Sequence, residues 1–118
     1  MELSRDAECG MHLWTLTLHA ISNQPSIPNA CYGASKALVN WYSVRINAED
    51  QWLNSFVFDP GLSATDMGYQ AVRTFGFPEA MLADPNKVSD GMVAVLRDAS
   101  KEKYGGKLVS YTGEIKDW

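Results

Sequence analysis

The stretch CYGASKAL, residues 31–38, places a tyrosine four residues before a lysine where a helical pattern begins. From about Ala30 to Ala48 the large side chains recur at helical spacing. Leu38, Trp41, Tyr42 and Arg45 stand at i, i+3, i+4 and i+7, and Val44 and Ile46 widen the apolar stripe. We therefore predict a long amphipathic helix over about residues 30–48, whose apolar stripe packs against the chain's own sheet.

Three segments around this helix have the composition of buried strands. They are MHLWTLTLHA (11–20), WLNSFVFDPG (52–61) and GGKLVSY (105–111), and Pro60-Gly61 ends the second. The two prolines of ISNQPSIPNA (21–30) indicate a loop, and residues 62–82 read as a loop with a short helix. Asp84 followed by Pro85 is typical of an N-cap and a first helical residue.

The order strand, helix, strand, helix, strand predicts an α/β fold with parallel strands. At 118 residues the chain is expected to form a single domain. Parallel strands need cover on both faces, and about three strands make a narrow sheet. We therefore expect part of a Rossmann-like, doubly wound parallel sheet with flanking helices, truncated relative to a whole one.

Composition excludes several classes of function. The net charge of −4 argues against bulk attraction to nucleic acid or to anionic membranes. No apolar run approaches the roughly 20 residues of a membrane span, and the start MELSRDAECG lacks the apolar core of a secretory signal. Cys9 and Cys31 fit reduced, buried thiols better than a disulfide framework. We expect a cytoplasmic protein, and the sequence suggests no metal site.

Tyr32 and Lys36 are neighbours on a helix, with Cβ atoms about 5–6 Å apart. Moving a phenol from its usual pKa near 10 to about 7 takes roughly 4 kcal/mol. A cation about 4 Å away at an effective dielectric near 20 supplies about that much. The pair therefore predicts a phenol tuned for acid–base catalysis, although a bare Y-x-x-x-K is also compatible with an interfacial tyrosine and a solvated lysine.

Two longer motifs favour the catalytic interpretation of Tyr32 and Lys36 over the interfacial one. YGASK (32–36) resembles the Y-x-A-S-K active-site motif of the short-chain dehydrogenase/reductase superfamily. DPGLSATDM (59–67), after the next strand, is similar to the P-G-x-x-x-T segment of that superfamily. The sequences around these motifs, WLNSFVFDPGLSATDMG (52–68) and GGKLVSYTGEIKDW (105–118), resemble the fungal ketoreductases of the norsolorinic acid reductase type. The resemblance covers residues 21–118, as the catalytic half of the domain, and leaves 1–20 as a divergent strand region.

The resemblance implies roles for five residues. Tyr32 would be the general acid in reduction of a ketone by NADP or NAD in its reduced form. Lys36 would lower the phenol pKa and bind the nicotinamide ribose. Pro60 and Gly61 would let the backbone pass close to the nicotinamide, and Thr65 would contact its amide or the phosphates.

Other positions are left with alternatives. The resemblance implies that residues 66–77 form the variable segment that covers substrate. Its aromatic and sulfur side chains either shape an apolar or aromatic substrate pocket or pack beneath a loop: Met67, Tyr69, Phe75 and Phe77. The usual spacing for the catalytic serine falls near His19 or Ala20, so the candidates are Ser22 and, alternatively, Thr17. His12 and His19 are read as strand residues rather than catalytic ones.

The chain departs from the family pattern in one large respect. It has neither the G-x-x-x-G-x-G loop that receives the cofactor pyrophosphate at a helix N-terminus nor the N-N-A-G segment.

Three hypotheses about function follow: a ketoreductase acting on an aromatic polyketide-like ketone, a catalytically incompetent subunit of a full-length reductase, or a chain without an independent fold or function. In the second, the helix around 30–48 would form the dimer interface, with Trp41 and Tyr42 as anchors.

Overall fold

The computed structural model describes residues 9–14, 24 and 26–118. Within this part of the chain, four strands form one sheet in the order β1-β2-β3-β4. They are β1 (Cys9–Trp14), β2 (Leu53–Asp59), β3 (Leu108–Ser110) and β4 (Ile115–Lys116). The first three are parallel, and β4 runs antiparallel to β3. The helices are α1 (Ala30–Glu49), α2 (Asp66–Phe75), the short 3₁₀ helix η2 (Glu79–Met81), α3 (Pro85–Arg97) and α4 (Lys101–Tyr104).

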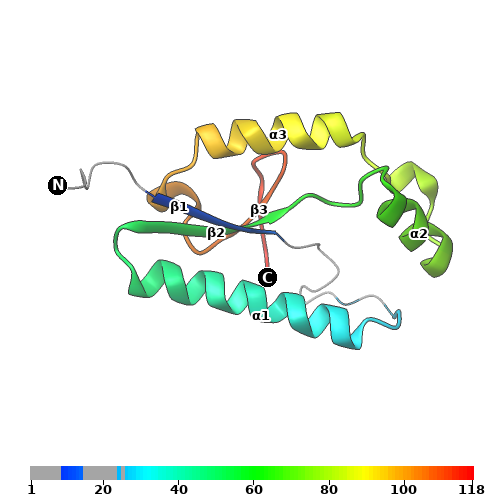
Figure 1. The fold of residues 1–118 in the computed structure, drawn as a ribbon, viewed down its shortest axis with the longest axis horizontal. Helices are drawn as coiled ribbons and strands as arrows, with labels where there is room; N and C mark the ends of the chain where they lie inside the picture. Colours follow the sequence, from blue (N-terminus) through cyan, green and yellow to red (C-terminus); the bar gives the residue numbers. More distant parts are fainter. Residues whose placement is uncertain (1–8, 15–23, 25) are drawn as a thin grey trace.

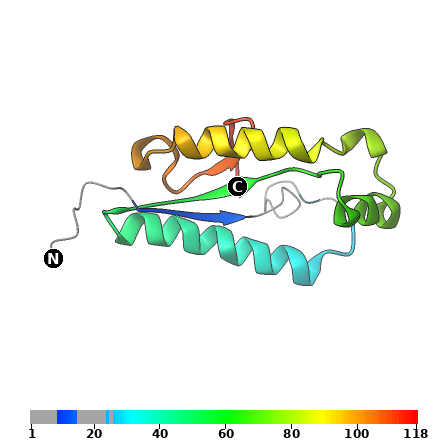
Figure 2. The same cartoon turned by 45° about the horizontal axis from the view of Figure 1, so that its top comes forward.

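The sheet lies between α1 on one face and α3 on the other, as Figure 1 and the turned view in Figure 2 both show. This layering confirms the predicted α/β fold with parallel strands. The two-residue strand β4 was not predicted, because the strand and the turn at Gly113 before it are too short to carry a periodic pattern. No helix within the described ranges is long and apolar enough to cross a bilayer.

The hydrophobic core lies between β2 and α3. All seven residues of β2 are buried. Phe56 and Phe58 face the helices α3 and α4, and the ring of Phe56 lies 5.6 Å from that of Tyr104. The rest of this cluster consists of Val88, Met92, Val95 and Val109. The run of apolar residues in LNSFVFD is explained by cover on both faces of a central parallel strand.

Helix α1 packs on the sheet with the face opposite to the one we predicted. Trp41 and Tyr42 are 57% and 51% exposed, whereas Asn40 and Ser43 are buried. The Ser43 hydroxyl lies 3.1 Å from that of Ser55 in β2, within hydrogen-bonding distance. The expectation that the apolar stripe covers the chain's own sheet is therefore wrong. Small polar side chains that pair with the strand allow close contact without an apolar face.

The C-terminal end of α1 is held by a lysine from α4. The Lys101 ammonium, with three N–H donors, lies within hydrogen-bonding distance of four acceptors: Asn47 O at 2.6 Å, Asn47 Oδ1 at 3.0 Å, Asp50 O at 3.0 Å and Leu53 O at 2.7 Å. The last turn of α1 has no basic residue of its own. Because the final carbonyls of a helix lack partners within it, Lys101 supplies the positive charge and the donors they need.

The remaining local expectations have mixed outcomes. Asp84 caps α3 by accepting from the Asn86 N–H at 2.9 Å, with Pro85 as the first helical residue, as predicted. The strand expected over 11–20 is β1 at Cys9–Trp14; residues 15–20 lie outside the described part. The expectation of buried thiols is wrong for Cys31, which is exposed.

Candidate active site

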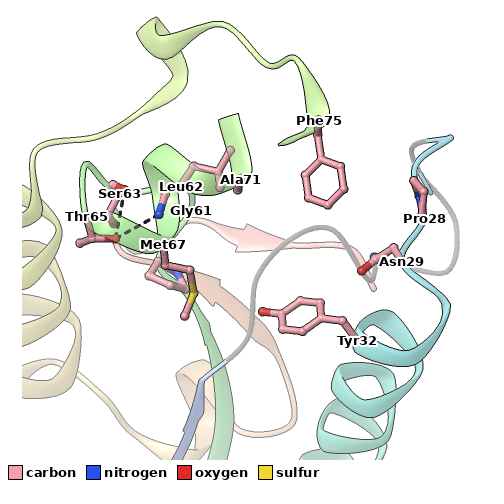
Figure 3. Close-up of a pocket in the computed structure, with 12 residues that line it drawn as sticks. Pro28, Asn29, Tyr32, Gly61, Leu62, Ser63, Thr65, Met67, Ala71 and Phe75 are labelled. Atoms are coloured by element: carbon pink, nitrogen blue, oxygen red, sulfur yellow. Dashed lines mark hydrogen bonds between the residues drawn. The ribbon is translucent and has the colours of Figure 1, made fainter. Parts of the chain in front are cut away.

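A cavity of about 530 Å³ opens between the start of α1, the bend after β2 and the helix α2 (Figure 3). It lies at the carboxyl end of β2, the end of a parallel sheet at which α/β folds bind their ligands. Its lining comes from three segments: Pro28, Asn29 and Tyr32; Pro60, Gly61, Leu62 and Ser63; Thr65, Met67, Gly68, Ala71 and Phe75. Apolar side chains and backbone make up most of this wall.

Tyr32 stands in the first turn of α1 and directs its hydroxyl group into this cavity, away from the helix (Figure 3). The side chain is 42% exposed. Partial burial raises the pKa of the Tyr32 phenol above its ordinary value of 10.0, because leaving water disfavours the phenolate. A phenol is protonated at neutral pH at its ordinary pKa, and burial moves the pKa of Tyr32 further from neutrality.

Lys36 lies one helical turn further on, on the same side of α1. Its ammonium is 5.6 Å from the centroid of the Tyr32 ring, a cation–π contact. The prediction that the two side chains are neighbours is confirmed. Burial raises the pKa of Tyr32 in this structure, and the lowering of that pKa by Lys36 stays a prediction.

The Pro60–Gly61 bend shares the cavity with Tyr32, as the two motifs predicted. Gly61 has φ of 64°, a left-handed conformation that side chains disfavour. Its N–H donates to Asp59 Oδ1 at 2.9 Å. Asp59 is fully buried, and its Oδ2 accepts from Lys116 Nζ at 2.7 Å. The local sequence D-P-G therefore makes the bend through a side-chain-to-backbone turn.

Thr65 also lines the cavity, but its hydroxyl is already used within the protein. Its Oγ1 accepts from the Gly68 N–H at 3.3 Å, which caps α2, and lies 3.4 Å from Ser63 O (Figure 3). Threonine at this position is thus explained by helix capping. Contact with a cofactor remains a prediction for Thr65.

Of the four residues predicted to shape a substrate pocket, Met67 and Phe75 line the cavity. Phe77 lies outside the lining, with its ring 5.9 Å from that of Phe75. Tyr69 is 40% exposed and lies outside the lining.

Sequence reasoning missed lining residues in the loop and in α2, namely Pro28, Asn29, Leu62, Ser63, Gly68 and Ala71. Gly68, which lies in the first turn of α2, was the one available sequence signal for a close approach of this helix to the bend. A Cβ at Gly68 would stand 1.9 Å from Ser63 O, so only glycine lets α2 approach the bend this closely.

Several candidate residues are untested. Thr17, His19 and Ser22 lie outside the described residues, so the position of the catalytic serine stays a prediction. His12 lies in β1, paired with Phe56 of β2. Among the residues described, no three His, Cys, Asp or Glu side chains are grouped as metal ligands would be.

No family model matches the chain. Norsolorinic acid ketoreductase of Aspergillus parasiticus is 38% identical over 88 residues, which cover 72% of this chain and 31% of that protein. Short-chain dehydrogenase RED3 of Pyricularia oryzae is 31% identical over 88 residues, covering 74% of this chain and 35% of the relative. The chain therefore spans about a third of the length of these curated relatives.

A solved structure has the same fold. The carbonyl reductase from chicken fatty liver, crystallised with NADPH bound, superposes with a TM-score of 0.78 at 18% identity, over 92% of this chain and 42% of that one. The relatives carry short-chain dehydrogenase and ketoreductase names, and the two ordered motifs meet at one cavity. On these grounds the chain matches, in sequence and in fold, a part of the proteins of the short-chain dehydrogenase/reductase superfamily.

Proposed function

We propose that this chain carries the proton-donating part of an NAD(P)H-dependent ketone reductase. One observation supports this above the others: Tyr32, the Pro60–Gly61 bend and Thr65, which come from two separate motifs, line one apolar cavity. A volume of about 530 Å³ is within the range of small-molecule sites. The reaction is assigned to the cytoplasm, as expected from the sequence.

The cavity fits the nicotinamide end of such a cofactor. Gly61 brings bare backbone to the wall, and a Cβ there would find only Tyr111 Cε1, at 4.0 Å. Both this bend and Tyr32 belong to the lining of the cavity. The pyrophosphate end is not assigned to any residue, because the sequence has no G-x-x-x-G-x-G loop. The choice between NAD and NADP is likewise left open.

The chain's own residues would act on the proton. When bound, the reduced nicotinamide would supply a hydride to the carbonyl carbon. Tyr32 Oη, whose pKa burial raises above its ordinary value, would donate a hydrogen bond and then its proton to the carbonyl oxygen. Lys36, with its ammonium against the ring, would stabilise the phenolate that remains.

The wall residues suggest the substrate class. Met67 and Phe75 face the cavity from α2, and Leu62 and Ala71 add aliphatic surface. Aromatic and sulfur side chains pack well against a flat ring. We therefore propose an aromatic ketone, of the polyketide-like class that the resemblance suggested.

Turnover tests this proposal directly. Purified chain is mixed with NADPH or NADH and 1-acetonaphthone, and loss of nicotinamide absorbance is followed. Tyr32→Phe should lower the rate by roughly 10²–10⁴-fold, the usual contribution of a general acid. Tyr69→Phe is the matched control, because that phenol lies outside the lining, and its rate should be unchanged. Equal rates for Tyr32→Phe and the parent chain would contradict the role of Tyr32.

The exposed face of α1 supports a second candidate function, as a subunit of a reductase assembly. Leu38, Trp41, Tyr42 and Val44 are all exposed. Trp41 and Tyr42 pack edge to face at 5.4 Å, and Arg45 lies 5.9 Å from the Trp41 ring. Aromatic residues and arginine are the usual anchors of interfaces. We propose that this face binds the equivalent helix of a second reductase subunit.

Light scattering during size-exclusion chromatography tests the second candidate. The parent chain should elute as a dimer at micromolar concentration, or bind a full-length reductase when the two are mixed. Trp41→Ser should weaken association by at least about 30-fold, since interface hot spots contribute about 2 kcal/mol or more. Trp52→Ser, which removes an exposed tryptophan outside this helix, is the control and should not change association. A parent chain that stays monomeric under both conditions would contradict this role.

A further inference from the structure

We propose that the Asp59–Lys116 ion pair is a positioning device, through which the C-terminal hairpin of the chain fixes the shape of the bend beside Tyr32. The consequence for ligand binding rests on the proposed function, but the positioning itself does not. Neither residue belongs to the tyrosine–lysine motif or lines the cavity as described above.

Asp59 is built into the bend from beneath. It is the last residue of β2 and has no exposed surface. Its Oδ1 accepts from the Gly61 N–H at 2.9 Å, while its Oδ2 accepts from Lys116 Nζ at 2.7 Å. One carboxylate therefore joins the glycine of the bend to a side chain 57 residues further along the chain.

The Gly61 contact controls a large share of the cavity wall. Gly61 needs its left-handed conformation, φ of 64°, for the chain to turn from β2 toward α2. The four consecutive residues Pro60, Gly61, Leu62 and Ser63 all line the cavity. The far end of this segment is tied by the Ala83 N–H, which donates to Leu62 O at 2.8 Å, and by the Ala64 N–H, which donates to Ala83 O at 2.9 Å. Asp59 is the corresponding tie at the near end.

Lys116 ties the hairpin to the same carboxylate. It lies in β4, which pairs antiparallel with β3, and Asp59 of β2 pairs with Ser110 of β3. The Tyr111 N–H also donates to Asp59 O, at 3.2 Å. The hairpin thus contacts Asp59 through both its backbone and its side chain. Movement of β4 relative to β2 would be transmitted to the Gly61 N–H.

The use of charge supports positioning over simple stabilisation. A buried ion pair gives little net stability compared with an apolar pair of similar size. An uncharged side chain at position 59 could still accept a hydrogen bond from the Gly61 N–H. The negative charge of Asp59 adds attraction to Lys116, and this attraction keeps the carboxylate in one orientation. A lysine at position 116 is therefore explained by orientation of the Asp59 carboxylate rather than by packing of the core.

The first experiment follows amide hydrogen exchange by NMR in the full chain. Lys116→Met should speed exchange at Gly61 by roughly 10- to 100-fold, the range expected when a charge-assisted hydrogen bond loses its fixed acceptor. Exchange at Val57, whose N–H donates to Lys107 O within the sheet, should stay unchanged. Lys116→Arg should restore the Gly61 protection. Lys107→Met, which removes an exposed ammonium that donates to Lys103 O, is the matched control.

Lys116→Met removes the cation beside a buried carboxylate, so a second variant guards against unfolding. Asp59→Asn combined with Lys116→Met removes both charges and keeps an oxygen for the Gly61 N–H. The proposal predicts faster exchange at Gly61 in this double variant, at unchanged Val57 exchange. Gly61 protection equal to that of the parent chain in both variants would overturn the proposal. A uniform rise at all amides would overturn it too, since that indicates a general loss of stability.

Binding of reduced nicotinamide mononucleotide separates this proposal from the proposed function. In Lys116→Met the affinity for this probe should fall by roughly tenfold if the bend forms the site, with Lys116→Arg close to the parent. If the parent chain does not bind the probe, the proposed function fails, while the Gly61 exchange result still decides the positioning role. If the probe binds parent and Lys116→Met equally, the pair does not position the binding wall.

Discussion

Gly68 is the residue whose substitution probes the packing of the cavity wall most sharply. Replacing glycine by alanine inside a helix normally stabilises it by about 1 kcal/mol, because glycine costs more backbone entropy. At Gly68 the new Cβ would lie 1.9 Å from Ser63 O and 3.2 Å from Leu82 Cδ2. An ordinary contact needs at least 3.4 Å. The backbone of Ser63 must therefore move by roughly 1.5 Å, or α2 must tilt away.

That movement opposes the helix-propensity gain and exceeds it. Ser63 O also accepts from the Thr65 N–H at 2.7 Å, and a shift of this size breaks the bond. Overpacking costs about 1–3 kcal/mol, and the lost hydrogen bond about 1 kcal/mol. After the helix gain is subtracted, we expect Gly68→Ala to lower the free energy of unfolding by about 1–3 kcal/mol. Because Ser63 lines the cavity, ligand binding there should weaken as well.

Urea unfolding followed by tryptophan fluorescence measures this free energy. Gly33→Ala is the matched control: it makes the same change in the first turns of α1, where the nearest atom is the end of a side chain, Asn29 Nδ2 at 3.0 Å. Its free energy of unfolding should stay within about 1 kcal/mol of the parent value. A Gly68→Ala variant as stable as the parent, with the same denaturant slope, would refute the packing of α2 on the bend.

Three further predictions follow from single contacts. Lys101→Met should lower the free energy of unfolding by about 2–4 kcal/mol, because it removes a partly buried ammonium that has four acceptors within hydrogen-bonding distance. Lys107→Met should cost less than about 1 kcal/mol, and equal losses in urea unfolding would contradict the role of Lys101 at the end of α1. The Tyr32 phenol should titrate above pH 10.0 in the difference in phenolate absorbance between parent and Tyr32→Phe. Because the pKa of Tyr32 is raised in the folded state, the stability that the neutral phenol contributes is complete below pH 10.0 and is lost as the pH rises through the folded pKa. A titration midpoint below pH 10.0 would contradict this prediction and show that Lys36 outweighs burial. Phe75→Ala should raise the KM for an aromatic ketone by about tenfold, because Phe75 lines the cavity. Phe77→Ala should raise it much less, because Phe77 contacts Phe75 but lies outside the lining, and a larger effect at Phe77 than at Phe75 would place the substrate elsewhere.

The elements of the fold were predictable where local sequence decides them. The helix that begins near Ala30, the strand that ends before Pro60-Gly61 and the cap formed by Asp84 each rest on residues a few positions apart. The face of α1 was not predictable. Ser43 is buried because it meets Ser55, and the end of α1 is held by Lys101 more than 50 residues away. Periodicity alone assigns the apolar side inward and misses such partners.

The candidate site shows the same division. The spacing of Tyr32 and Lys36 predicted that they are neighbours, and the second motif predicted that Gly61 lies beside them. The spacing could not give the partial burial of the Tyr32 phenol, which sets the direction of its pKa shift. Nor could it give the role of Asp59, whose partner Lys116 lies on another strand.

The central claim is that the cavity beside Tyr32 binds the nicotinamide end of the cofactor. It is tested most directly by titrating the purified chain with reduced nicotinamide mononucleotide, with 2′,5′-ADP as the adenosine-side control. We predict saturable binding of the nicotinamide half that shifts the NMR signals of Tyr32 and Gly61, with no such shift from the adenosine half. Signals of Tyr32 and Gly61 that stay unmoved at millimolar ligand would contradict the claim.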